Sequence, residues 1–143
     1  MYEEVVRARG HENVSAEHAS TFEVTSDDWL TPAGDCILAV EADRTPEDFD
    51  DDFVAACQDE SATITAIVEV EDDDGETYQQ TVEGSGHPDL TFEGDRSHVG
   101  RTSDYVDDRT ILVGADAAAG DFDRDLVAAL ANGGDVTFTL RVE

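Results

Sequence analysis

Residues 42–57 have the sequence ADRTPEDFDDDFVAAC, and 73 positions later residues 115–130 have the sequence ADAAAGDFDRDLVAAL. The two stretches are identical at nine of sixteen positions, which indicates an internal duplication. A duplicated unit of this size predicts a fold built from two copies packed against each other. The stretch contains no catalytic or ligand-binding motif, so it indicates the architecture of the protein and not its function.

Each copy of this stretch is expected to contain a short helix. Asp50 precedes the first apolar stripe and is suited to cap the helix N-terminus, and Asp123 occupies the same place in the second copy. After each helix, apolar residues alternate with polar ones over residues 64–70 and 136–142. This period of two predicts that each copy ends in a half-buried strand.

The segments before the first helix also show strand patterns. Residues 2–9 are expected to form a strand that ends at Gly10 and His11. Residues 14–24 alternate over eleven positions, which predicts one long half-buried strand, and the apolar run 36–40 predicts a buried strand.

The fold class that follows is mainly β with two short helices. We expect one domain over residues 1–143, made of two repeats at about residues 2–70 and 77–143. Two pseudo-two-fold related strand-strand-helix-strand units would then form an antiparallel-rich β-sandwich or a closed barrel, since one unit alone is too small to bury its sheet. A double-psi-type barrel is the most specific form of the barrel alternative.

The charge of the chain is extreme. Thirty-six acidic residues stand against eight arginines and no lysine, giving a net charge of −28. Such a chain repels itself in dilute buffer, but at ~1 M salt the screening length falls to about 3 Å. The composition therefore indicates a halophilic protein in a high-KCl environment. With 39% hydrophobic residues in clear periods, a disordered chain is disfavoured.

Composition also bears on location and partners. There is no apolar run near 18 residues, so we expect no membrane partner and a cytoplasmic protein with two free thiols. The eight arginines are scattered, and no basic patch or stacking platform argues for nucleic acid. A homodimer remains among the expectations.

Seven short motifs together resemble the archaeal family known as domain of unknown function 371. They are RGHENVSAEH at 9–18, TFEVT at 21–25, LTP at 30–32, GDCI at 34–37, AD at 42–43, SD at 103–104 and DRT at 108–110. The resemblance extends over essentially the whole chain. It implies an archaeal, single-domain, mainly β protein and carries over no catalytic residues.

Histidines give the first candidate site. His11 and His87 follow equivalent glycines in the two copies, and equivalent turns can meet at a pseudo-two-fold axis. Together with Asp35, Asp89 or Asp104 they could hold Zn²⁺ or another divalent metal. The alternative is that each imidazole only bonds the backbone of its own turn, because no established metal-binding spacing is present.

Cys36 gives the second candidate site. A thiolate nucleophile would need a nearby base or cation, which His18, Asp35 or Arg109 could supply. The alternatives are a buried structural thiol at Cys36 and a satisfied core histidine at His18, on the inward face of its strand. Asp104 and Arg109 could form a ligand clamp or, as we prefer, a structural ion pair.

Three functions therefore remain open. The first is a small-molecule or divalent-metal binding domain with its site near the pseudo-two-fold axis. The second is an enzyme that uses Cys36 or a histidine-bound metal. The third is a structural or protein-interaction module, which predicts an uncharged patch on an otherwise acidic surface.

Overall fold

A computed structural model describes residues 1–143 and is mainly β, as the sequence predicts. The elements in chain order are β1 (Tyr2–Arg9), β2 (Thr21–Thr25), β3 (Ile37–Ala39), α1 (Asp51–Cys57), β4 (Thr63–Glu71), β5 (Thr77–Ser85), β6 (Ser97–Arg101), β7 (Thr110–Leu112), α2 (Arg124–Ala131) and β8 (Asp135–Val142). One turn of 3-10 helix precedes each α-helix, at Pro46–Asp48 and Ala119–Asp121. Neither helix has the length or apolar character needed to span a bilayer.

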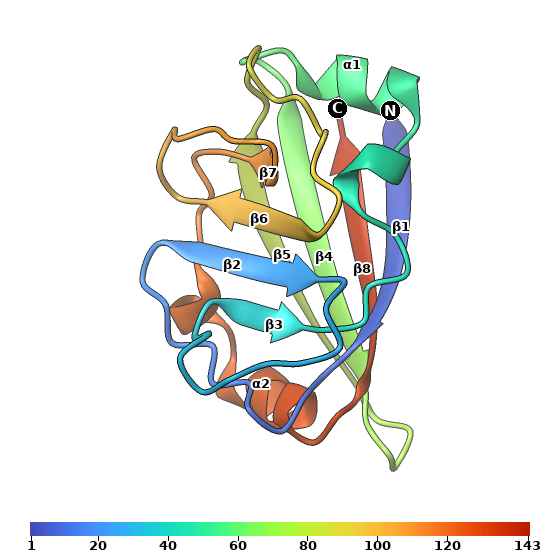
Figure 1. Cartoon of the computed structure of the whole chain (residues 1–143), viewed down its shortest axis with the longest axis vertical. Helices are drawn as coiled ribbons and strands as arrows, with labels where there is room; N and C mark the ends of the chain where they lie inside the picture. The colour runs from blue at the N-terminus through green and yellow to red at the C-terminus, as the bar shows by residue number, and fades with distance from the viewer.

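The strands form two four-stranded sheets. The long sheet has the order β1-β8-β4-β5 and is antiparallel throughout. The short sheet has the order β3-β2-β6-β7, with an antiparallel central pair and a parallel strand on each side. The strands of the short sheet run across those of the long sheet, and the helices lie at opposite ends of the molecule (Figure 1).

The two sheets do not close into a barrel. Single bridges between Arg9 and Val40, and between Ser85 and Val113, join their edges at one residue on each side. A closed barrel needs continuous ladders at both edges. The structure therefore contradicts the closed-barrel alternative, including its double-psi form.

The strand orders have an internal symmetry. Exchanging β1 with β5, β2 with β6, β3 with β7 and β4 with β8 reproduces both sheets. Individual bonds repeat in the same way: the Arg7 amide donates to Asp43 Oδ1 over 2.9 Å, and the Glu83 amide donates to Asp116 Oδ1 over 3.0 Å. These matched bonds are what the predicted duplication requires, and the duplication itself remains an inference.

The core lies between the inner faces of the two sheets. Phe22 of the short sheet contacts Phe138 of the long sheet with ring centroids 6.5 Å apart, and both rings are fully buried. At the start of α1, the Asp50 side chain accepts a bond from the Asp52 amide over 3.2 Å, which confirms the predicted cap. The Asp123 side chain makes no such bond.

The predicted strand over residues 14–24 is wrong in its first half. The structure has only Thr21–Thr25 as a strand, because Ala16 adopts a positive φ of 49° that an extended chain cannot contain. Phe92 has a φ of 51° in the segment before β6. His18 therefore lies in a turn and not on the inward face of a strand. The predicted strand over residues 36–40 is shorter as well, at Ile37–Ala39.

Candidate functional site

The structure does not bring His11 and His87 together. His11 lines a shallow hollow with Gly133, just beyond α2, whereas the His87 amide donates to the carbonyl of Cys57 at the end of α1. The two helices are at opposite ends of the molecule (Figure 1). No three His, Cys, Asp or Glu side chains are arranged to hold a metal ion. His11 and His87 therefore cannot share one metal ion in this fold.

Each of these imidazoles bonds its own turn. Nδ1 of His11 accepts the Asn13 amide and Nδ1 of His87 accepts the Asp89 amide, each over 3.0 Å. These matched bonds agree with the alternative that both residues stabilise turns.

His18 and Asp35 also make hydrogen bonds with the backbone of their surroundings. Nδ1 of His18 accepts the amides of Ser20 and Thr21, each over 3.2 Å. The backbone carbonyl of Asp35 accepts the amide of His18 over 3.2 Å. Neither contact directs the imidazole toward Cys36.

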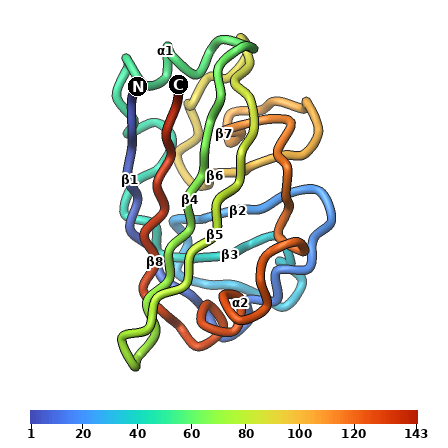
Figure 2. The backbone as a smooth tube through the Cα atoms, turned by 180° about the vertical axis from the view of Figure 1, so that it is seen from behind, coloured from blue at the N-terminus to red at the C-terminus, as the bar shows by residue number.

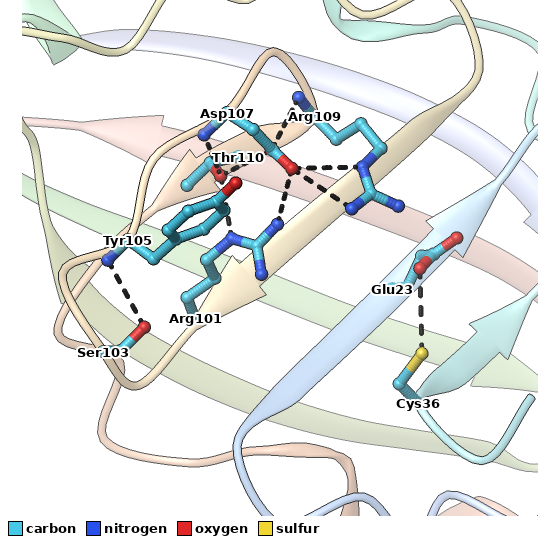
Figure 3. A network of polar contacts seen from close by, with 8 residues as sticks. All are labelled: Glu23, Cys36, Arg101, Ser103, Tyr105, Asp107, Arg109 and Thr110. Carbon is cyan, nitrogen blue, oxygen red and sulfur yellow. Dashed lines mark hydrogen bonds and ion pairs between the residues drawn. The ribbon is translucent and has the colours of Figure 1, made fainter.

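Cys36 lacks the surroundings of a nucleophile. Its thiol donates to Glu23 Oε1 over 3.7 Å (Figure 3). Burial, and then the negative charge of Glu23, raise the pKa of the Cys36 thiol to about 11. The guanidinium of Arg109 is bonded to Asp107 instead. The structure thus favours the neutral thiol, which is a poor nucleophile.

We therefore expect Cys36 to react slowly with a thiol reagent. With a pKa of about 11 against a reference value of 9.0, its thiolate fraction near pH 8 is roughly 100-fold below that of a free cysteine. Replacing Glu23 by glutamine should speed labelling several-fold, because it removes a negative charge. The measurement is the labelling rate in a Cys57→Leu background, which leaves Cys36 as the single thiol. Rapid labelling that Glu23→Gln leaves unchanged would show that Glu23 does not control this thiol.

A cluster around Asp107 is the main polar feature that the sequence did not reveal. Asp107 Oδ2 accepts bonds from Arg101 over 3.0 Å and from Arg109 over 3.1 Å (Figure 3). Two of the eight arginines of the chain thus meet at one carboxylate. Arg101 is only 11% exposed and Asp107 is 22% exposed, so solvent screens their ion pair incompletely.

Thr110 and Tyr105 complete this Asp107 cluster. The Thr110 hydroxyl donates to Asp107 Oδ1 over 2.9 Å and accepts the Arg101 Nε–H, also over 2.9 Å. The Tyr105 ring lies over the Arg101 guanidinium at 4.8 Å, which is within the range of a cation–π contact. Tyr105 is held by its neighbours and yet remains 59% exposed.

These contacts fix the charge of Asp107. Partial burial raises the pKa of its carboxyl, but hydrogen bonds from Thr110 and Arg109 and the charge of Arg101 outweigh burial and hold the pKa at about 2. Asp107 is therefore ionised throughout the neutral range. Arg109 pairs with Asp107 and not with Asp104, so the predicted ion pair between Asp104 and Arg109 is wrong.

A pocket of about 520 Å³ opens beside the Asp107 cluster. It is lined by side chains from residues 87–93 on one side and residues 104–108 on the other, and we call it the Tyr105 pocket. It gathers three of the candidate residues selected from the sequence, His87, Asp89 and Asp104. The sequence offered one signal for it, because Tyr105 lies between Asp104 and the acidic pair Asp107 and Asp108.

Comparison with known proteins places the chain in a family. The sequence profile described as "Domain of unknown function (DUF371)" matches residues 6–143. The chain is also similar to "Uncharacterized protein MJ0206" of the archaeon Methanocaldococcus jannaschii, with 36% identity over 138 residues, 96% of this chain and 98% of the relative. The match agrees with the resemblance found in the motifs. The chain therefore belongs to the domain of unknown function 371 family.

Proposed function

We propose that this protein is a small-molecule binding domain whose site is the Tyr105 pocket and whose ligand is a small organic cation. The observation that carries the proposal is the set of carboxylates around the exposed ring of Tyr105. Glu93, Asp104 and Asp108 line the pocket, and none of them takes part in an ion pair of the chain.

The chemistry of the pocket suits a cation. Carboxylates without a partner attract positive charge, and an aromatic ring adds a face over which an ammonium or guanidinium group can lie. The volume of about 520 Å³ is within the range of small-ligand sites. The Tyr105 ring is already oriented by Arg101, so little side-chain freedom is lost on binding.

The first half of the chain provides a matched control. Trp29 is 55% exposed and has the Arg96 guanidinium 5.9 Å from its ring, much as Tyr105 has Arg101. No pocket of the molecule includes Trp29. Trp29 thus presents the same kind of aromatic–arginine pair without a pocket beside it.

The test is a calorimetric titration with putrescine, a diamine, and with its uncharged counterpart 1,4-butanediol. We expect one putrescine to bind per chain, at least a tenfold loss of affinity in Tyr105→Ala and in Asp104→Asn, and no change in Trp29→Ala. The diol should not bind. Equal losses in the Tyr105 and Trp29 variants, or weak binding at many sites, would mean that putrescine only neutralises surface charge.

An enzymatic role through Cys36 is less well supported, because its thiol is neutral at ordinary pH. We also propose that the chain consists of two duplicated repeats. The Tyr105 pocket then belongs to the second repeat and does not lie on the pseudo-two-fold axis between the repeats. We further propose, from the net charge of −28, that the protein works in a cytoplasm rich in KCl.

A further inference from the structure

The outer face of the long sheet is uncovered. The helices close the two ends of the space between the sheets, and neither crosses the outer side of β1, β8, β4 and β5 (Figure 2). The inward residues of these strands are buried, while the alternate residues point outward. A sheet face of this size is open to a partner.

A row without charge crosses the centre of this face. The strand registers place Val5 beside Thr139, Thr139 beside Ile67, and Ile67 beside Thr81. We call these four residues the neutral row. A chain with 36 acidic residues carries none of them here, although the outer face of a strand is where charged side chains are easily placed.

Charges on either side of the neutral row are mixed in sign. One flanking row contains Glu3 and Arg141, which form an ion pair at 2.9 Å, and ends in Glu83. The other contains Arg7 and Glu69. The next row contains Arg9 together with Asp135 and Glu71. Three of the eight arginines thus lie on this one face among acidic residues.

We propose that this face is the interface with a second copy of the chain. A two-fold axis lying in the interface, perpendicular to the strands and along the neutral row, sets each neutral residue against the same residue of the second copy. The two flanking rows then exchange places. Glu3 faces Arg7 of the second copy, and Arg141 lies diagonal to Glu69 of the second copy.

The distribution of charge favours a second copy of the chain as the partner that covers this face. Two chains of −28 repel each other through most of their surfaces, so self-association requires a face where acidic groups meet arginines. The two-fold axis forms each of these pairs twice, once from each copy to the other, as an isologous contact requires. The threonine, valine and isoleucine side chains of the neutral row have the size that fills the ~10 Å space between stacked sheets.

The size of the face indicates a reversible dimer. Four strands about 4.8 Å apart and eight residues long at about 3.3 Å each present roughly 500 Å² of face per copy. This is at the small end of specific interfaces. We therefore expect a dimer that dissociates on dilution and persists in molar KCl, which screens the remaining repulsion.

The test is sedimentation equilibrium over a wide range of protein concentration in molar KCl. The native chain should show a monomer–dimer equilibrium, and Ile67→Glu should shift it at least tenfold toward monomer. Thr31→Glu is the matched control, because it adds the same charge to an exposed loop residue outside the face. The melting temperature of each variant shows whether the fold is retained.

A charge exchange identifies the second copy as the partner. Arg7→Glu should weaken the dimer, and the double variant Glu3→Arg, Arg7→Glu should recover it, since the opposed pair is restored with reversed polarity. A native chain that is monomeric at every concentration would overturn the inference. A dimer that Ile67→Glu leaves unchanged would overturn it too, because the contact would then use another surface.

Discussion

Replacement of Asp107 by alanine is expected to lower the free energy of unfolding by about 3 kcal/mol, the cost of leaving one partner of a largely buried ion pair uncompensated. Arg101 would keep its charge at 11% exposure with only the Thr110 hydroxyl as acceptor. Arg109 would lose its carboxylate as well. The measurement is urea unfolding of both proteins at one fixed KCl concentration.

Asp104→Ala is the control for this result. Asp104 is an exposed carboxylate of the same loop and forms no ion pair, so its removal should change stability by less than about 0.5 kcal/mol. The two variants lose the same formal charge. Equal effects would mean that general charge repulsion, and not the contacts of Asp107, determines the stability of this loop.

The second large effect is a loss of folding stability at low pH that is caused by the buried side chain of His98. His98 is completely buried between the sheets, with its ring stacked on Phe49 at 5.3 Å and 5.9 Å from Phe138. Nε2 bonds the Arg44 carbonyl over 2.8 Å, and because a carbonyl can only accept, Nε2 carries the proton. Nδ1 is buried without any partner. The imidazole is therefore held neutral.

Burial lowers the pKa of His98 from 6.5 to about 4. Between these two values the unfolded chain binds a proton that the folded chain does not, so stability falls as the pH is lowered through this window. A difference of this size corresponds to about 3 kcal/mol once the pH is below 4. Between pH 6.5 and 5 few carboxylates titrate, so the early part of the loss is due mainly to histidine.

His98→Phe should remove this part of the pH dependence. Phe22 is the second residue of β2, as His98 is of β6, and its ring contacts Phe122 at 6.0 Å, which shows that the core accepts a phenyl ring in such a place. The slope of unfolding free energy against pH between 6.5 and 5 should be smaller in the variant than in the native chain. An unchanged slope in His98→Phe would show that His98 is not the titrating group.

The sequence predicted local structure best where a pattern was repeated. The helices after Asp50 and Asp123 and the strands β4 and β8 follow from apolar periodicity seen twice. The long strand over residues 14–24 failed because alternation does not reveal a positive φ at Ala16. Glycine would have suggested a positive φ in the sequence, but Ala16 does not, because alanine rarely adopts this conformation.

The candidate site was harder to predict, because it depends on which loops are adjacent. The sequence alignment sets His11 against His87 in the two predicted repeats, but a two-fold relation can place equivalent turns far apart as easily as together. The Asp107 cluster depends on Arg101 at the end of β6 reaching into the following loop. No spacing rule predicts that contact, and strand order had to be known first.

The most direct test of the proposed cation site is an NMR titration of the four imidazoles with putrescine. Only His87 lines the Tyr105 pocket, while His11 lies beyond α2, His18 lies in its own turn and His98 is in the core. We expect the His87 ring signals to shift and saturate at one ligand per chain, and the other three sets to stay in place. If the His87 signals stay in place, or if His11 and His18 shift equally with it, the Tyr105 pocket is not the binding site.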